Sequence, residues 1–235
     1  MKKLRMVVLT GAGISAESGL RTFRDSDGLW EGYNVYEVAS PDGWKKDPQL
    51  VLDFYNMRRR DVLNALPNAA HTGLAELQEH FDLHIITQNI DDLHERGGAK
   101  QVWHLHGEIT KMRSVLDTER TYPYNEDIKL GDLAADGGQL RPFIVWFGEE
   151  VPMIEQAVTL VRQADIFVVI GTSLLVYPAA GLLDIVPRHV PVFVIDKSLP
   201  NVKQRPYLHL IEKPATEGVK DLKELVQTYI QSQNN

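Results

Sequence analysis

The chain has 235 residues, which is enough for one large domain or for one domain that carries a smaller lobe. Its apolar fraction of 43% and charged fraction of 24% are ordinary for a globular protein, and its net charge of -7 argues against a nucleic-acid partner. Because the sequence contains no cysteine, disulfides, thiolate catalysis and cysteine-ligated zinc or iron–sulfur sites are excluded.

The N-terminus carries no targeting pattern. The basic start Met1–Arg5 is followed only by the short apolar run Met6–Leu9, which is too short for the apolar region of a signal peptide. No later stretch has the length and apolar character that a bilayer span needs. We therefore expect a cytoplasmic protein with no membrane partner.

Short β-branched runs alternate with helix-length segments along most of the chain. The expected strands are Met6–Leu9, Leu83–Thr87, Val102–Leu105, Ile166–Ile170 and Val192–Ile195. The expected helices are Ala69–His80, Ile154–Gln163, Ala179–Val186 and Val219–Gln231. This alternation predicts an α/β fold with a doubly wound, Rossmann-like parallel sheet that is covered on both faces.

Two stretches are too long to be ordinary connections between these elements. Residues 31–64 begin irregularly and become helical from about Pro48, and residues 109–140 are polar and contain Pro123. We expect these two insertions to pack together as a small lobe. Residues 1–30, 65–108 and 141–235 then form the larger, Rossmann-like domain.

A glycine turn follows the first expected strand. Gly11, Gly13 and Ala16 fit the pattern G-x-G-x-x-A, which lets a backbone approach a pyrophosphate at the N-terminus of a helix. A plain strand-to-helix turn is the alternative. Ser18–Trp30 shows no second strand ending in an acidic residue, so an ordinary dehydrogenase is disfavoured and a loop over the phosphates and ribose is expected.

Polar residues follow several of the other expected strands. Gln88, Asn89 and Asp91 offer amide and carboxylate groups, although Asp91 could equally serve as a helix cap. Gly171–Ser173 and Asp196 end two further strands. Because open α/β sheets bind ligands at the carboxyl ends of their strands, we expect these residues to line one crevice.

Two histidines end the strand that begins at Val102. His104 and His106 share one strand face, but a metal pair would lack an evident third ligand, and His104 also fits a hydrogen-bonded buried histidine. His106 lies beside Gly107 at the strand end and is the better general base. We expect the remaining histidines to be structural or solvated: His71, His80, His84, His94, His189 and His209.

Taken in order, these motifs resemble the sirtuin family of NAD-dependent protein-lysine deacylases. The resemblance covers most of the chain and is carried by Gly11–Gly19, Phe23–Arg24, Gln88–Asp91, His106–Gly107, Val145–Glu149 and Gly171–Ser173. It implies that NAD is cleaved, that an acyl group passes from lysine to ADP-ribose, and that nicotinamide, O-acyl-ADP-ribose and free lysine are the products.

The resemblance also implies a role for individual residues. His106 would be the general base on a ribose hydroxyl, and Asn89 would be the second catalytic residue. NAD would contact Gly11, Ala12, Gly13, Ala16, Thr22, Phe23, Arg24, Trp30, Gln88, Asn89, Ile90, Asp91, Gly171, Thr172, Ser173, Asp196 and Ala215. An acyl-lysine protein or peptide would bind along Val145, Trp146, Phe147 and Gly148.

Tyr55 and Arg58 add a prediction about the acyl group. A spacing of three places both side chains on one helix face, where a guanidinium fork and a hydroxyl can bind a carboxylate. The pair matches the Tyr-x-x-Arg motif of class III sirtuins, which prefer succinyl, malonyl or glutaryl lysine. The alternative is that Arg58–Arg60 is a solvated run of charge.

The chain departs from the family at two places. The family usually has two cysteine pairs that bind structural zinc, whereas Ser114 and Asp136–Gly138 stand here where cysteines might be expected. We therefore expect a zinc-free lobe that is held by its own packing. Asp196 replaces a common asparagine, and its charge should favour NAD over NADP because it repels a 2′-phosphate.

Three other functions stay open at this point. The chain could be a plain deacetylase in which Arg58 serves only the surface. It could also be an ADP-ribosyl transferase, or a non-catalytic module that binds NAD or ADP-ribose.

Overall fold

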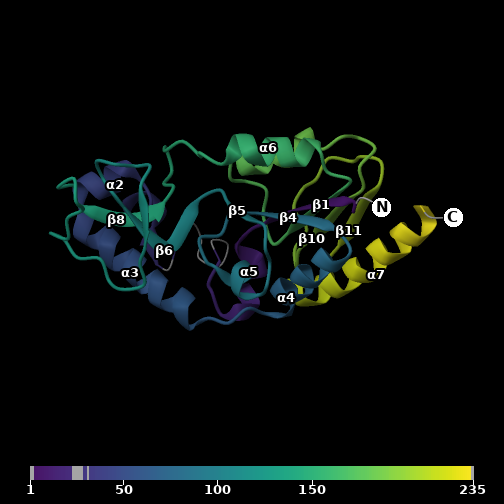
Figure 1. Ribbon diagram of the computed structural model, residues 1–235, viewed down its shortest axis with the longest axis horizontal. Coiled ribbons are helices and arrows are strands. Elements are labelled where there is room, and N and C mark those ends of the chain that lie inside the picture. Colours follow the sequence, from purple (N-terminus) through teal and green to yellow (C-terminus); the bar gives the residue numbers. More distant parts are fainter. Residues whose placement is uncertain (1–2, 23–28, 31, 234–235) are drawn as a thin grey trace.

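The computed structural model describes residues 3–22, 29–30 and 32–233, and its larger part is built on a six-stranded sheet (Figure 1). The strands lie in the order β11-β10-β9-β1-β4-β5, and all neighbours are parallel. Their bounds are β1 Arg5–Thr10, β4 Asp82–Thr87, β5 Val102–His104, β9 Ile166–Ile170, β10 Val192–Ile195 and β11 Leu208–Ile211. The predicted doubly wound parallel sheet is confirmed, with β11 as an additional strand.

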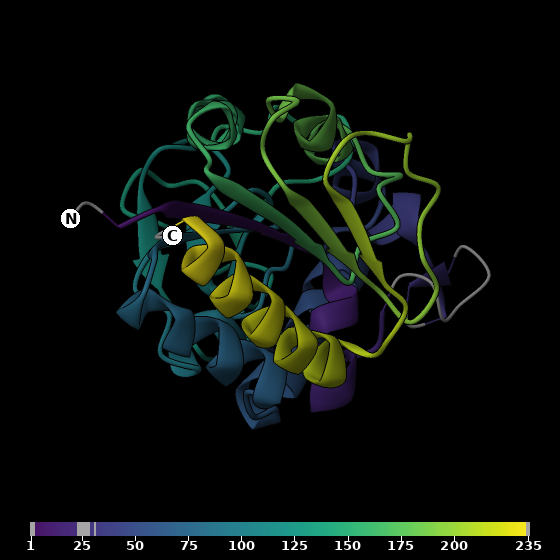
Figure 2. The same ribbon diagram turned by 90° about the vertical axis from the view of Figure 1, so that its right-hand side faces the viewer.

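Alternate residues of each central strand enter different apolar cores, one on each face of the sheet. Met6 and Val8 face a cluster that includes residues of α4 (Ala69–Glu76) and α7 (Ala215–Gln233). Val7 and Leu9 face a cluster that includes residues of α6 (Ile154–Arg162) and η4 (Ala179–Ile185). Figure 2 shows α7, in yellow, on one side of the strands and the green helices on the other. This two-sided burial explains the continuous apolar runs in the sequence.

Several expected helices take a tighter form in the structure. Ala179–Ile185 is a 3-10 helix, and α4 ends at Glu76, after which Leu77–Glu79 continues as the 3-10 turn η3. The glycine motif implied an α-helix directly after the turn, and this prediction is wrong. The segment forms two 3-10 turns instead, η1 Ala12–Ile14 and η2 Ala16–Ser18. Glycine and serine are poor helix formers, and they recur through this segment.

The two insertions meet in a small lobe at the end of the molecule away from α7 (Figure 1). An antiparallel sheet in the order β7-β6-β8 packs against α3 (Pro48–Asn64). The predicted helix start at Pro48 is confirmed, with Asp47 accepting a hydrogen bond from the Leu50 N–H. The remaining elements of this region are β2 Leu29–Trp30, β3 Tyr33–Asn34, α1 Val35–Val38, α2 Pro41–Lys46, α5 Leu93–Arg96, β6 Gly107–Ser114, β7 Thr121–Pro123 and β8 Leu140–Ile144.

Three consecutive arginines of α3 have three different environments. Arg59 is buried, and it donates to the backbone oxygens of Ile109 (2.8 Å) and Glu126 (3.0 Å) and to the side chain of Asn56 (2.9 Å). Arg58 is also buried, whereas Arg60 forms an exposed ion pair with Asp127. The solvated-run interpretation is therefore wrong for two of the three residues.

Asn56 fastens the same helix to the second insertion. Its side-chain amide donates to the Ile128 oxygen (2.8 Å) and accepts from the Ile128 N–H (3.0 Å). Such paired bonds satisfy backbone groups that no strand or helix satisfies. Among the residues that the structure describes, no helix is long and apolar enough to cross a membrane.

Candidate active site

The carboxyl ends of the parallel strands lie in register along one edge of the large sheet. Thr10 of β1 pairs with Thr87 of β4 and with Ile170 of β9, and Ile170 pairs with Ile195 of β10. The chain leaves β1 toward β4 on one side and returns through β9 on the other. Ligands bind at such a reversal of strand order, because the connecting loops diverge there and leave a crevice.

The glycine turn packs directly against the end of β9. The N–H of Gly11 donates to Ile170 (3.0 Å), and the N–H of Gly13 donates to Gly171 (2.8 Å). A Cβ on Gly13 would lie 2.6 Å from the Gly171 Cα, and Gly171 itself has a φ of +65°. These two glycine amides are therefore committed to the neighbouring strand end. The glycines allow two chain turns to touch, with the half-buried Ala12 and Ala16 beside them.

A buried polar network lies beneath this turn. The Ser15 hydroxyl donates to Asp91 Oδ2 (3.1 Å) and accepts from Asn89 Nδ2 (3.1 Å). It also lies 3.4 Å from His71 Nε2. Because His71 Nδ1 accepts from the Asn68 N–H, a neutral His71 carries its proton on Nε2 and donates to Ser15. The network thus fixes the positions of two predicted site residues, Asn89 and Asp91.

His71 and His94, which were expected to be structural or solvated, are buried structural residues. His94 Nε2 lies 3.0 Å from the Thr10 hydroxyl, and the two imidazole rings meet edge to face at 5.0 Å. Burial lowers the pKa of His71 to about 4 and lowers the pKa of His94 as well. Both rings are therefore neutral at pH 7. Burial raises the pKa of the Asp91 carboxyl in the same network.

His104 and His106 differ in how many of their nitrogens are engaged. His104 Nδ1 lies 3.1 Å from the Asn89 oxygen, and Nε2 lies 2.8 Å from Glu95. Burial lowers the pKa of His104, but the hydrogen bond and charge of Glu95 outweigh burial and raise it overall. His104 is thus a hydrogen-bonded buried histidine, as its alternative interpretation had it.

His106 keeps one nitrogen available. Its Nδ1 lies 3.0 Å from the Gln88 oxygen, which assigns the proton of the neutral ring to Nδ1 and leaves the lone pair on Nε2. Burial lowers the pKa of His106, and this hydrogen bond offsets only part of the decrease. A neutral imidazole at the sheet edge, with no partner recorded for Nε2 among the residues that the structure describes, is suited to accept a proton.

The predicted peptide-binding segment begins next to this histidine. The Val145 N–H donates to the His106 oxygen (2.9 Å), and the Phe147 N–H donates to the Ala39 oxygen (3.0 Å). Trp146 is buried, whereas Phe147 and Gly148 are exposed, and Gly148 has a φ of +91°. The segment therefore connects the large sheet to the small lobe.

Tyr55 and Arg58 lie in the interior of the small lobe beside the same segment. Tyr55 is fully buried in one apolar cluster with Trp146, and Arg58 is 5% exposed. Burial raises the pKa of Tyr55, while the Trp146 side chain and the charges of Arg141 and Arg58 offset part of the rise. The helix thus brings the tyrosine, the arginine and the tryptophan into one neighbourhood.

The other residues predicted to contact NAD lie at several strand ends and at the start of α7, and some lie outside the described part of the chain. Gln88 Nε2 donates to Thr172 Oγ1 (3.1 Å), so two strand ends are joined. Asp196 is buried and accepts from the Ser198 N–H (3.0 Å), and Ala215 is the buried first residue of α7. Buried in addition are Thr22 and Ile90, and Ser173 is half-buried. Phe23, Arg24 and the side chain of Trp30 lie outside the described part of the chain.

A hydrogen-bonded turn includes Ser114 and Asp136–Gly138, the positions at which the family resemblance would imply cysteines. Ser114 donates to Asp136 Oδ1 (2.9 Å), and Asp136 Oδ1 also accepts from the Gly138 N–H (2.8 Å). These bonds hold β6 against the 136–138 turn. Residues 3–22, 29–30 and 32–233 contain no group of three or more histidine, aspartate or glutamate side chains that could hold a metal ion.

The sequence and the fold agree on one family. Residues 11–178 match the model of the Sir2 family. The chain belongs to the Sir2 family. Its Sir2-family relatives include the NAD-dependent protein deacylase of Helicobacter pylori, 52% identical over 217 residues that cover 92% of this chain and 95% of that protein. The NAD-dependent protein deacylase of Bacteroides thetaiotaomicron is 53% identical over 227 residues, with coverage of 94% and 97%.

Solved Sir2 structures have the same architecture. A Sir2 homologue in complex with ADP-ribose superimposes with a TM-score of 0.87 at 37% identity, over 97% of this chain and 94% of that chain. A Sir2 homologue in complex with NAD gives a TM-score of 0.86 at 38% identity, over 97% and 91%. The expected sirtuin fold, with a Rossmann-like sheet and a second lobe, is therefore confirmed.

Proposed function

We propose that this Sir2-family chain is an NAD-dependent protein-lysine deacylase that prefers acidic acyl groups such as succinyl, malonyl and glutaryl. The substrates are acyl-lysine proteins or peptides, and the products are nicotinamide, O-acyl-ADP-ribose and free lysine. The observation that supports the proposal is the course of the Val145–Gly148 segment. The segment is hydrogen-bonded to His106 at Val145, and its Trp146 packs in one apolar cluster with Tyr55, one helix turn from Arg58.

The residues at the sheet edge fit NAD. Asn89 and Asp91 are fixed by Ser15 next to a turn of small residues, where bulky side chains would block a ligand. Asp196 and Ala215 lie at the end of β10 and the start of α7, where the adenosine half is proposed to bind. When bound, NAD supplies an activated ribose carbon and nicotinamide as a leaving group.

His106 is proposed to move the proton in this reaction. Its Nδ1–H is held by the Gln88 oxygen, so Nε2 can accept a proton from a ribose hydroxyl without a change of tautomer. Its lowered pKa keeps it neutral at pH 7. Asn89 is proposed to orient the group at the nicotinamide end, because its side-chain amide is fixed on Ser15.

Tyr55 and Arg58 are proposed to bind the carboxylate at the far end of the acyl chain. A guanidinium keeps its charge at all working pH values, and it pairs with a carboxylate through two parallel hydrogen bonds. A neutral acetyl group offers no such partner. The preference therefore rests on a charge-assisted contact that acetyl-lysine cannot make.

The test compares two arginine variants of α3. We expect Arg58→Met to lower kcat/KM for succinyl-lysine peptide by a factor of about 10 to 100, since a hydrogen bond to a charged group contributes about 1.5–3 kcal/mol. The rate with acetyl-lysine peptide should change little. Arg60→Met, two positions along and exposed, is the matched control. Mass spectrometry of the peptides with NAD measures each rate.

Two results would refute the acyl preference. One is equal turnover of succinyl and acetyl peptides by the wild-type chain, which would indicate a plain deacetylase. The other is a succinyl preference that survives Arg58→Met, which would place the carboxylate elsewhere in the site.

A further inference from the structure

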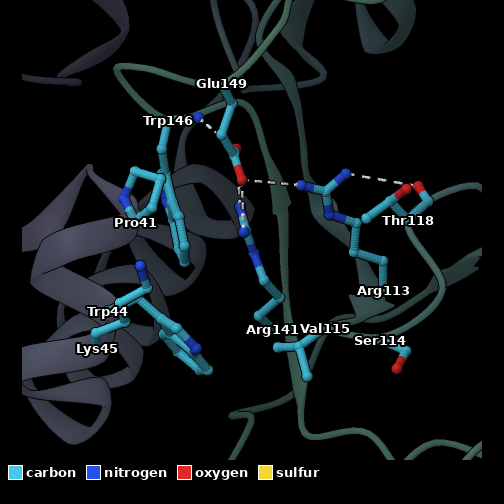
Figure 3. Close-up of a pocket in the computed structure, with 10 residues that line it drawn as sticks. All are labelled: Pro41, Trp44, Lys45, Arg113, Ser114, Val115, Thr118, Arg141, Trp146 and Glu149. Atoms are coloured by element: carbon cyan, nitrogen blue, oxygen red, sulfur yellow. Dashed lines mark hydrogen bonds and ion pairs between the residues drawn. The ribbon is translucent and has the colours of Figure 1, made fainter.

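A pocket lies in the small lobe, away from the edge of the large sheet. It has a volume of about 180 Å³ and lies between α2 and the β6–β8 sheet (Figure 3). Figure 1 places α2 and β8 at the end of the molecule away from the large sheet. Drug-sized pockets measure about 300–1,000 Å³, so this one suits a smaller molecule.

Apolar side chains form one wall of this pocket. The rings of Trp44 and Trp146 lie 5.7 Å apart with an interplanar angle of 36°, and Pro41 adjoins them. Val115 lies across from this wall and is 37% exposed. Aromatic and aliphatic walls of this kind favour a planar, apolar ligand body.

Positive charge dominates the rest of the lining. The cations Arg113 and Arg141 both pair with a single carboxylate, that of Glu149, and Lys45 at the pocket rim has a long contact of 4.0 Å with Asp42. Arg141 donates to Glu149 at 2.8 Å and to the Ile144 oxygen at 2.7 Å, and its guanidinium lies over the Trp146 ring. Its buried Nε has no hydrogen-bond partner in the described part of the chain. An added anion would therefore compensate an excess of cations.

Arg113 is held by longer hydrogen bonds than Arg141. Its contacts to Glu149 (3.3 Å) and to the Thr118 oxygen (3.5 Å) are both long. Its Nε is buried and has no hydrogen-bond partner among the residues that the structure describes. The residue is only 9% exposed, so neither water nor its long hydrogen bonds fully compensate the positive charge of its guanidinium.

We propose that this pocket binds a small organic monocarboxylate with a planar, apolar body. The body packs against Trp44 and Val115, and the carboxylate accepts hydrogen bonds from Arg113. Glu149 is shared with the site described above, because its Oε2 accepts from the Trp146 N–H at 2.8 Å. A bound carboxylate therefore acts on the Val145–Glu149 segment through Glu149.

The test uses benzoate as the probe and the indole N–H signals of the whole protein in two-dimensional NMR. We expect benzoate to shift the signals of Trp44 and Trp146 in a saturable way and to leave that of Trp103 unchanged. Trp103 belongs to β5 of the large sheet. Benzyl alcohol has the same ring without charge, and acetate has the charge without the ring.

The expected dissociation constants distinguish the contribution of the carboxylate from that of the aromatic ring. Benzyl alcohol and acetate should each bind at least about tenfold more weakly than benzoate, which is the factor that one charge-assisted or one apolar contact gives. Arg113→Gln and Trp44→Leu should weaken benzoate binding to a similar extent. Lys111→Gln, on the same strand but paired with Glu108 outside the pocket, is the control.

Three results would overturn the proposal. They are the absence of saturable shifts at Trp44 and Trp146, unchanged benzoate affinity in Trp44→Leu, and binding of benzyl alcohol as tight as that of benzoate. If Arg113→Gln does not fold, Trp44→Leu and the ligand series decide the question. None of these readouts needs turnover of NAD or peptide, so a failure here is distinct from a failure of the proposed deacylase function.

Discussion

The edge of the large sheet and the interior of the small lobe both contain buried polar side chains, but they hold them by different means. At the sheet edge, the register of parallel strands places Thr10, Thr87 and Ile170 side by side before any side chain is considered. In the lobe, the side chains of Asn56 and Arg59 themselves bond the backbone of other segments. At the sheet edge the backbone register thus sets the positions of side chains, whereas in the lobe Asn56 and Arg59 themselves hold separate segments together.

The largest expected effect is the loss of activity on replacing His106, which lies at the edge of the large sheet. Replacing it with alanine should lower kcat/KM by a factor of about 100 to 10,000, the range for loss of a general base. The unfolding temperature should hardly change, because the strands hold this edge. His189→Ala, at an exposed position, is the control. Retained activity in His106→Ala would refute the role of His106 as general base. A large loss of stability would contradict the idea that the strands hold the sheet edge independently of this side chain.

Arg59→Met tests the lobe in the opposite way. It leaves the Ile109 and Glu126 oxygens without their donor, and we expect a loss of about 3 kcal/mol in the free energy of unfolding. Arg60→Met removes only an exposed ion pair and should cost about 0.5 kcal/mol or less. Urea denaturation measures both. Equal effects of the two variants would contradict the structural role of Arg59.

Ser114→Ala tests the hydrogen-bonded turn that stands where cysteines were expected. The Ser114 oxygen bonds Asp136 and accepts from the Leu116 N–H, so its removal should cost about 1 kcal/mol. Thr228→Ala on the exposed side of α7 should cost less and serves as the control. An unchanged urea midpoint would show that the lobe does not depend on this turn. Stoichiometric zinc in the purified wild-type chain, measured by elemental analysis, would overturn the zinc-free lobe.

The smallest expected effect is a pH dependence of stability that comes from His104. Because Glu95 raises the folded-state pKa of His104 above its ordinary value of 6.5, its contribution is complete below pH 6.5 and is lost as pH rises through the folded value. Glu95→Gln should flatten this part of the stability curve. Unfolding temperatures measured from pH 5 to about pH 8 test it, and an unchanged slope would refute the pairing.

The sequence predicted the sheet because its signals are local. Runs such as Ile166–Ile170 are apolar without interruption, and turn residues follow each of them. The order of polar strand ends then follows from the topology of parallel sheets. β11 was missed because its edge position leaves His209 and Leu210 exposed, so Leu208–Ile211 lacks the apolar run of a buried strand.

The rest of the site depends on contacts that sequence spacing does not reveal. His71 meets Ser15 across 56 positions, and His94 meets Thr10 across 84 positions. Each histidine lies in a helix, and its partner in a distant segment cannot be anticipated from the spacing. Arg59 was likewise indistinguishable from Arg60 until the position of residues 109–128 was known. The roles of the NAD-contacting and peptide-contacting residues stay predictions.

One measurement tests the central claim most directly: the product balance when the chain is incubated with NAD and a succinyl-lysine peptide. The account predicts that nicotinamide, free-lysine peptide and O-succinyl-ADP-ribose form in equal amounts, and that all three disappear in His106→Ala or fall together to a small residual rate. Nicotinamide release with an intact succinyl peptide, or transfer of the ADP-ribose to protein, would contradict it.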